Sequence, residues 1–146
     1  MSKTRILIHI VFTTKYREQT IPQQFKRGLY AYMHGIIKNF KSKTLRINGT
    51  FDHVHIFLDL HPSFSVASLV KELKRSSSLW TKGKKEFKFF RGWNDGYYAA
   101  SVGPSEENTT IEYIRNQENH HGVKSLDEEF HEMALLYHLD LDKEDI

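Results

Sequence analysis

Alternating hydrophobic residues predict the strands of this chain, because successive side chains of a strand point to opposite faces of a sheet. The segments with this alternation are rich in β-branched and aromatic residues and are too short to form helices of their own. They cover residues 5–14, 45–48, 51–60 and 97–102. Gly49 supplies a turn between the second and third of these segments, so we expect them to form an antiparallel hairpin.

Hydrophobic residues that recur every three or four positions predict a helix after each of the first and third strands. The first helix opens at Pro22 and buries Phe25, Leu29, Met33, Ile36, Ile37 and Phe40. The second has Ser65 as its N-cap and buries Val66, Leu69, Val70 and Leu73. The resulting order, β-α-β-β-α-β, is that of an α+β, ferredoxin-like fold, in which an antiparallel sheet carries both helices on one face.

The C-terminal part of the chain predicts two more helices. One follows Gly103-Pro104 with Ser105 as its cap and ends at His120-His121-Gly122. The other opens with a capping box of Ser125 and Glu128 and continues through Leu126, Phe130, Ala134 and Tyr137 into the acidic tail 140–145. We expect one domain over residues 1–146, with a body of 1–103, a helix of 104–122 on the second sheet face, and a C-terminal helix and tail of 123–146.

Composition narrows the chemistry that such a domain can perform. The chain has no cysteine, which excludes disulfides, thiolate metal sites and cysteine nucleophiles. Residues 1–5 lead directly into a strand, so we expect no signal peptide, no membrane span and a cytoplasmic location.

Charge is distributed unevenly along the sequence. Residues 1–92 hold 18 basic and 5 acidic side chains, whereas residues 93–146 hold 3 basic and 13 acidic ones. A basic body favours a polyanionic partner, because binding releases condensed counterions, and nucleic acid is the leading class. The alternative is that the two parts of the chain neutralise each other within the fold.

Two histidines on the third strand form a candidate metal site. His53 and His55 are on one face of the strand, and alternate residues of a strand lie about 7 Å apart, so both rings can reach one divalent cation. His9 of the first strand could lie near the same face. Tyr113 and Gln117 are four residues apart and therefore adjacent on a helix. Taken alone, a strand histidine is more often a polar residue of a wet face, and a helical tyrosine at this spacing is more often a half-buried aromatic. His9 is likewise more often a satisfied, half-buried histidine than a member of the site.

Basic side chains near predicted turns, on the outward side of the second helix and on the third helix are candidate phosphate contacts. They are Lys15, Arg17, Lys71, Lys74, Arg75, Lys82, Lys84, Lys85 and Arg115. Residues 87–91 alternate aromatic and charged side chains, as a base-stacking platform would, or form a strand with its apolar side buried.

The combination His53-Val54-His55 and Tyr113-Ile114-Arg115-Asn116-Gln117 resembles the single-tyrosine HUH transposases of small bacterial insertion sequences and their relatives at repetitive extragenic palindromes. The resemblance also covers residues 10–17, 52–58, 69–80 and 93–102. It implies a homodimer that cuts and rejoins single-stranded DNA with short hairpins. It further implies that Tyr113 is the nucleophile, that it forms a 5′-phosphotyrosine, and that His53, His55 and Gln117 hold Mg²⁺ or Mn²⁺. In this family one subunit can supply its tyrosine to the metal site of the other.

Three other functions are compatible with parts of this pattern. A replication-initiator or relaxase nickase shares the histidines and the tyrosine, but such proteins are usually larger than 146 residues. A non-catalytic single-strand binding module would stack bases on Phe89, Phe90, Trp93 and Tyr97. A two-histidine phosphoesterase would need a hydroxyl two residues after each histidine, and His53 is followed there by His55.

Overall fold

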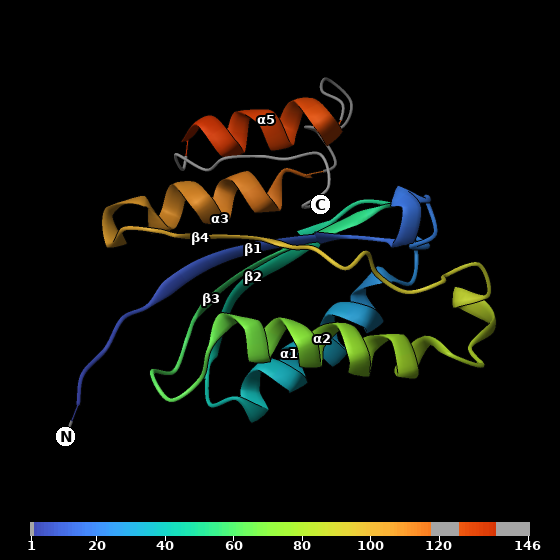
Figure 1. Ribbon diagram of the computed structural model, residues 1–146, viewed down its shortest axis with the longest axis horizontal. Coiled ribbons are helices and arrows are strands. Elements are labelled where there is room, and N and C mark those ends of the chain that lie inside the picture. The colour runs from blue at the N-terminus through green and yellow to red at the C-terminus, as the bar shows by residue number, and fades with distance from the viewer. Residues whose placement is uncertain (1, 118–125, 137–146) are drawn as a thin grey trace.

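A four-stranded antiparallel sheet forms the centre of the computed structural model, which describes residues 2–117 and 126–136. The strands are β1 (Leu7–Thr13), β2 (Lys43–Gly49), β3 (His53–Asp59) and β4 (Tyr98–Ser101), in the spatial order β2-β3-β1-β4. Helices α1 (Lys26–Asn39) and α2 (Val66–Thr81) cover one face, and α3 (Glu107–Arg115) and α5 (Leu126–Leu136) lie on the other (Figure 1). Short 3-10 turns are η1 (Lys15–Arg17), η2 (Lys85–Phe87) and η3 (Pro104–Glu106). The ferredoxin-like prediction is confirmed.

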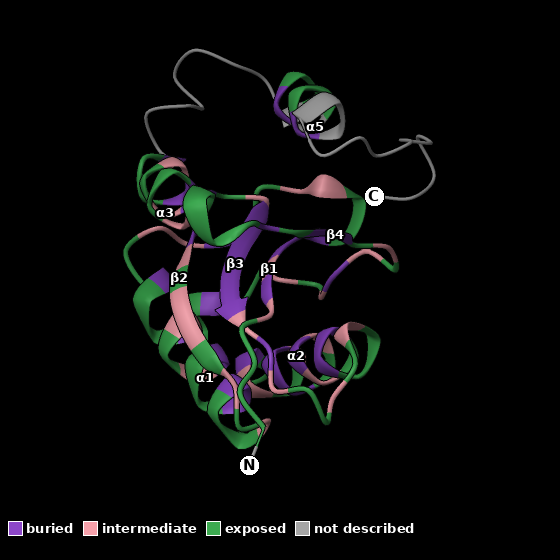
Figure 2. Cartoon of the chain, turned by 90° about the vertical axis from the view of Figure 1, so that its left-hand side faces the viewer, coloured by how far each residue is buried: buried purple, intermediate pink, exposed green. Residues whose placement is uncertain are grey.

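Strand β3 is buried on both faces, as Figure 2 shows, whereas β2 at the sheet edge is partly exposed. Val54, Ile56 and Leu58 face the α1–α2 layer and pack in the main core with residues of β1 and both helices. On the other face, Phe57 packs with Leu7, Val102 and Ile114. Helix α3 therefore closes the sheet face that carries His53 and His55, and both histidines are fully buried.

The hairpin and the cap of the second helix are as predicted. Strands β2 and β3 pair antiparallel, with Gly49 opposite Val54 and a register shift between Thr44 and Arg46. The Ser65 side chain accepts a hydrogen bond from the Ser68 amide at 3.0 Å. Because a capped amide needs no water partner, this bond fixes where α2 begins.

The structure corrects two predicted helix starts. Helix α1 begins at Lys26 and not at Pro22, and Phe25 is 40% exposed because it precedes the first helical turn. Ser105 does not cap a helix, because it lies within η3 and no side chain caps the start of α3. Residues 87–91 form no strand: Phe87 ends η2 and is buried, while Phe89 faces solvent.

Several predicted features lie outside the described residues. They are the helix end at 120–122, the cap at Ser125, Tyr137 and the acidic tail 140–145. Within the described ranges, α3 ends at Arg115 with Asn116 as its C-cap. None of the helices in these ranges is long and apolar enough to cross a membrane.

The β2–β3 turn requires glycine at position 49. A Cβ atom there would lie 2.2 Å from the His53 carbonyl oxygen and 2.9 Å from the Val54 Cα, both backbone atoms that cannot rotate away. We expect Gly49→Ala to destabilise the fold by about 2 kcal/mol or more, measured by urea unfolding.

Gly35 is the matched control, because it lies in the middle of α1 and a Cβ atom there would meet nothing within 4 Å. Gly35→Ala should stabilise the protein by roughly 0.5–1 kcal/mol, as alanine does in a helix interior. Equal effects of the two substitutions would contradict this account of the turn.

Candidate active site

Strand β3 directs both candidate histidines toward α3 and α5. His53 pairs with Thr13 of β1, and His55 pairs with Val11 of β1 and Asn48 of β2. The alternation of the strand places their rings on one side, with ring centroids 5.0 Å apart. Because β3 is an inner strand with both neighbours hydrogen-bonded, its backbone holds the two rings on a rigid base.

Hydrogen bonds fix the orientation of His53. Its Nδ1 lies 2.9 Å from Asp52 Oδ1 and 3.2 Å from Thr50 Oγ1, and its Nε2 lies 3.0 Å from Gln117 Oε1. A hydrogen donated from Nδ1 to the Asp52 carboxylate leaves a lone pair on Nε2 that faces the amide oxygen. Two facing acceptors at this distance need a shared proton or a cation, which is the environment of a metal ligand.

His55 is oriented by His9 of β1. His9 Nε2 lies 2.8 Å from His55 Nδ1, and the two rings are stacked with centroids 5.1 Å apart. Burial, followed by the charge of His55, holds the pKa of His9 well below its ordinary value, although Glu129 opposes the shift. A neutral His9 can therefore hold His55 with its Nε2 turned into the site.

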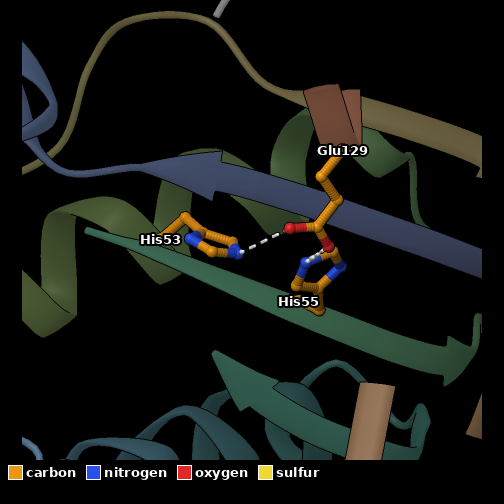
Figure 3. Close-up of side chains that lie close together, drawn as sticks. All are labelled: His53, His55 and Glu129. Atoms are coloured by element: carbon orange, nitrogen blue, oxygen red, sulfur yellow. Dashed lines mark ion pairs between the residues drawn. The ribbon is translucent and has the colours of Figure 1, made fainter. Parts of the chain in front are cut away.

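Glu129 of α5 brings a carboxylate between the two histidines (Figure 3). Its Oε1 lies 3.1 Å from His55 Nε2, and its Oε2 lies 3.8 Å from His53 Nε2. The residue is only 2% exposed. Burial alone would raise the pKa of Glu129, but the hydrogen bond and charge interaction with His55, together with the hydrogen bond from Tyr113, hold it well below its usual range.

Tyr113 reaches the same carboxylate from α3. Its hydroxyl donates a 2.5 Å hydrogen bond to Glu129 Oε1, and its ring stands edge-on to His55 with centroids 5.8 Å apart. Burial, followed by the charge of Glu129, raises the pKa of the phenol far above its usual range. The phenol is therefore protonated in this arrangement at neutral pH.

Gln117 completes the group from just beyond the end of α3. Its Nε2 donates to Glu129 Oε1 at 2.9 Å, and its Oε1 faces His53. Asn48 of β2 positions this end of the helix, because its Nδ2 donates to the carbonyl oxygens of Ile114 and Arg115 at 3.0 and 3.1 Å. The predicted proximity of Tyr113 and Gln117 thus occurs, although Gln117 lies outside α3.

The four side chains suit a hard divalent cation. The possible ligand atoms of His53, His55 and Glu129 lie within 4.8 Å of one another, and Gln117 adds an amide oxygen beside His53. Imidazole nitrogen with carboxylate and amide oxygen is a donor set for Mg²⁺ or Mn²⁺, and it contains no soft ligand. The residues present therefore fit the predicted metal.

Glu129 was not predicted from the sequence. It is one of three acidic residues in the first turn of α5, where acids commonly interact with the helix dipole. The signal that distinguishes it is helical spacing: Glu129 and Met133 are four apart and both are buried, so they belong to the inward side of the helix. The side chains of Leu126, Phe130 and Ala134 lie outside the described residues.

The predicted phosphate contacts fall into separate groups. Lys71, Lys74 and Arg75 lie along α2, beside a hollow of about 410 Å³ that Tyr97 also lines. Lys82, Lys84 and Lys85 line a second hollow of about 650 Å³ beyond the end of α2. Lys15 and Arg17 belong to η1, and Arg115 lies at the end of α3.

Some of these cations have structural partners. The Lys74 ammonium donates to the carbonyl oxygens of Asn94, Asp95 and Gly96 at 2.6, 2.9 and 2.8 Å, which holds the turn before β4. Arg17 pairs with Asp127 of α5. Arg75 and Arg115 pair with Glu72 and Glu112 on their own helices at 2.7 and 3.2 Å. Their contact with DNA stays a prediction.

Comparison with known proteins identifies relatives of this chain. Residues 2–117 match the model of the family described as "Transposase IS200 like". The transposase for insertion sequence element IS200 of Salmonella typhimurium strain LT2 is 31% identical over 114 residues, which cover 75% of this chain and 74% of that protein. The transposase for the same element in Salmonella typhi matches equally well.

Two solved structures have the same fold. One is of a Deinococcus radiodurans R1 protein, with a TM-score of 0.61 and 22% identity, covering 80% of this chain and 93% of that one. The other is of a REP-associated tyrosine transposase bound to a REP hairpin, with a TM-score of 0.61 and 15% identity, covering 84% of this chain and 75% of that one.

The buried imidazole of His9 predicts that stability depends on pH. Because its pKa is depressed in the folded state, the unfolded chain takes up a proton first as the pH falls. The stabilisation is therefore present above the ordinary histidine pKa of about 6.5 and is lost below it. We expect the urea unfolding free energy, measured in EDTA, to fall between about pH 7 and pH 5 by up to about 1.4 kcal/mol per pH unit.

Replacing His9 by Gln should flatten this slope, because the amide does not titrate. His34→Gln is the control, since His34 is exposed and lies on α1, away from this site. A slope that His9→Gln leaves unchanged, or that His34→Gln removes, would contradict the assignment.

Proposed function

Because the chain belongs to the IS200-like transposase family, we propose that it cleaves and rejoins single-stranded DNA through a covalent link to Tyr113. The observation that carries this proposal is the hydrogen bond from the Tyr113 hydroxyl to a carboxylate that also contacts His55. A phenol is thereby held beside the residues that fit a divalent cation. This is the arrangement that phosphoryl transfer to tyrosine needs.

The proposed reaction exchanges one phosphodiester bond for another. The Tyr113 oxygen attacks the scissile phosphorus and the bond from phosphorus to the 3′ oxygen breaks, while one proton passes in net from the phenol to the leaving 3′ oxygen; the products are a 5′-phosphotyrosine and a 3′-hydroxyl. An incoming 3′-hydroxyl reverses the step, releases the phenol and joins the new strand. No ATP or water is consumed, because each broken bond is replaced by one of the same kind.

His53, His55 and Gln117 are the proposed ligands of Mg²⁺ or Mn²⁺, with Glu129 as a further ligand. When bound, the cation would neutralise charge on the scissile phosphate and favour the ionised phenol. His9 keeps the His55 ring turned toward the site, and Asp52 does the same for His53. Asn48 anchors the end of α3, so that Tyr113 and Gln117 stay in register with the histidines.

The proposed substrate is a DNA strand with a hairpin at the end of an insertion sequence or a repetitive palindrome. The structural neighbour bound to a REP hairpin supports this choice, as do the basic groups on α2, η1 and the segment after α2. We also propose that the protein is cytoplasmic and forms a homodimer, as the family resemblance implies. Analytical ultracentrifugation would test the dimer. Tyr113 and the histidines of one chain already lie together, so each subunit can build its own site.

Tyr113→Phe should abolish covalent attachment to DNA, because it removes the attacking oxygen and leaves the ring in place. Wild type and variant are incubated with Mn²⁺ and 5′- or 3′-labelled single strands from the flanks of the gene, then separated under denaturing conditions. We expect the 3′ label on the wild-type protein only, because a 5′-phosphotyrosine retains the strand 3′ of the cut, whereas the 5′-labelled fragment is released with a free 3′-hydroxyl. Tyr98→Phe, at a tyrosine of β4, is the matched control and should retain the adduct.

An adduct that survives in Tyr113→Phe would place the nucleophile on another residue. Native binding of DNA without an adduct on any flank would instead support a non-catalytic binding module.

Glu129→Ala should weaken Mn²⁺ binding about tenfold or more, because it removes the anionic donor of the group. Isothermal titration calorimetry with Mn²⁺ measures this independently of activity. Glu128→Ala is the matched control, since Glu128 is the preceding, exposed residue of α5. Equal Mn²⁺ affinities of Glu129→Ala and wild type would remove Glu129 from the ligand set.

A further inference from the structure

The end of the sheet next to His53 carries a surface that the proposed chemistry does not use. Strand β1 finishes there with Thr13, which pairs with His53, and η1 follows. The segment after α2 reaches the same end, because the Lys15 amide donates to the Gly92 carbonyl and the Asn94 amide to the Thr13 carbonyl, each at 2.9 Å. Figure 1 shows η1 and this segment together at one end of the molecule.

The segment is strongly basic. Residues 82–91 contain five cations, Lys82, Lys84, Lys85, Lys88 and Arg91, against the single acid Glu86. All of these cations line the hollow of about 650 Å³ beyond α2. An adjoining hollow of about 410 Å³ is lined by Lys88, Phe89 and Arg91 together with residues 18–20, which follow η1. The two hollows form a basic path from the end of α2 to η1.

Two exposed aromatic rings lie at this path: Phe89 lines the smaller hollow, and Tyr16 belongs to η1, just before the residues 18–20 that line it as well. Tyr16 is 69% and Phe89 is 71% exposed, more than any other large hydrophobic residue among those the structure describes. The neighbouring rings of Phe87 and Trp93 are buried, so the exposure of Phe89 is not a general property of the segment. Cations flank both exposed rings: the Lys15 Nζ lies 5.7 Å from the Tyr16 centroid, and the Lys88 Nζ lies 5.0 Å from the Phe89 centroid.

The backbone at Tyr16 is strained. Tyr16 and Arg17 have φ angles of 60° and 54°, a left-handed conformation that costs a non-glycine residue on the order of 1 kcal/mol. Asn94 holds this conformation by accepting a hydrogen bond from the Tyr16 amide at 3.0 Å. The protein keeps this strained turn although the turn leaves the Tyr16 ring in solvent. This indicates that the ring has a role other than stabilising the fold.

We infer that this sheet-end surface, formed by residues 15–17 and 82–91, binds the unpaired DNA strand beside the scissile phosphate. Tyr16 and Phe89 stack on bases, and the cations of 82–91 contact the backbone. An unpaired strand fits better than a duplex, because exposed rings can stack only on bases that are not already paired. The inference rests on the proposed function, since Tyr113 defines where the scissile phosphate lies.

The test measures binding separately from cleavage. The two fluorescein-labelled probes are a twelve-nucleotide oligothymidylate and a blunt-ended hairpin. Binding of each probe is measured by fluorescence anisotropy in EDTA, so that no cleavage occurs. We expect Phe89→Ala and Tyr16→Ala each to weaken oligothymidylate binding about fivefold to tenfold, the loss typical of one stacked base. Phe89→Tyr and Tyr16→Phe keep an aromatic ring and should retain the affinity.

The basic residues have a charge-matched control. Replacing Lys82 and Lys85 by Ala should lower the slope of log affinity against log salt by about 0.7 for each lost phosphate contact. Lys38 and Lys43 are also exposed, but in the β2–β3 pairing Lys43 lies opposite Asp59, at the end of β3 far from His53. Replacing these two by Ala should leave the slope nearly unchanged. Circular dichroism melts confirm that each variant is folded.

The outcomes distinguish the inference from the proposed function. Loss of oligothymidylate binding in both ring variants supports the inference, even if wild type forms no covalent adduct. Wild-type adduct formation with oligothymidylate affinity unchanged in the ring variants overturns the inference and leaves the proposed function standing. Equal loss of blunt-hairpin and oligothymidylate binding, or binding of polyglutamate at the same surface, would also overturn it.

Discussion

A buried carboxylate ties the candidate active site together. Removing a charge from water costs several kcal/mol unless protein groups replace the lost hydration. Glu129 receives hydrogen bonds from Tyr113 and Gln117 and lies 3.1 Å from His55 Nε2. These partners belong to β3, to α3 and to the segment just after α3. Burial of the Glu129 carboxylate therefore requires these elements to pack against α5 in one arrangement.

The same contacts set the protonation state of Tyr113, the proposed nucleophile. A negative charge beside a buried phenol raises its pKa, so Tyr113 is protonated while Glu129 carries its charge. A divalent cation held by the same residues would act in the opposite direction, because it interacts favourably with the carboxylate and with an ionised phenol. In the proposed mechanism, metal binding and activation of the tyrosine are therefore linked through one residue, Glu129.

The basic residues show that charge in the sequence does not translate directly into a binding surface. Lys74 uses its ammonium to hold three carbonyl groups of the turn before β4, and desolvation by burial lowers its pKa. Arg17 is engaged by Asp127 of α5. Arg91 pairs with Glu18 at 3.8 Å, whereas the lysines of residues 82–88 gather around hollows beside an exposed ring. The distinction depends on partners that are distant in sequence.

Local patterns were sufficient to predict the sheet, the two helices on its first face and the placement of both histidines on one side of β3. Each follows from residues within a few positions of one another: alternation for the strands, periodicity for the helices, and Ser65 for the cap of α2. The proximity of Tyr113 and Gln117 was predicted in the same way, from their spacing of four residues. The predicted start of α1 was wrong, because Pro22 permits a helix start without requiring one, and Phe25, which precedes the helix, is 40% exposed.

Only the tertiary structure decided what surrounds those residues. Helical spacing aligns Glu129 with Met133, but it does not show that this side of α5 is buried, since burial depends on how α5 packs against a strand more than 70 residues earlier. The His9–His55 contact likewise depends on the register of β1 with β3, and the left-handed backbone at Tyr16 depends on Asn94. Sequence periodicity specifies which way a side chain faces, whereas long-range packing specifies what it meets.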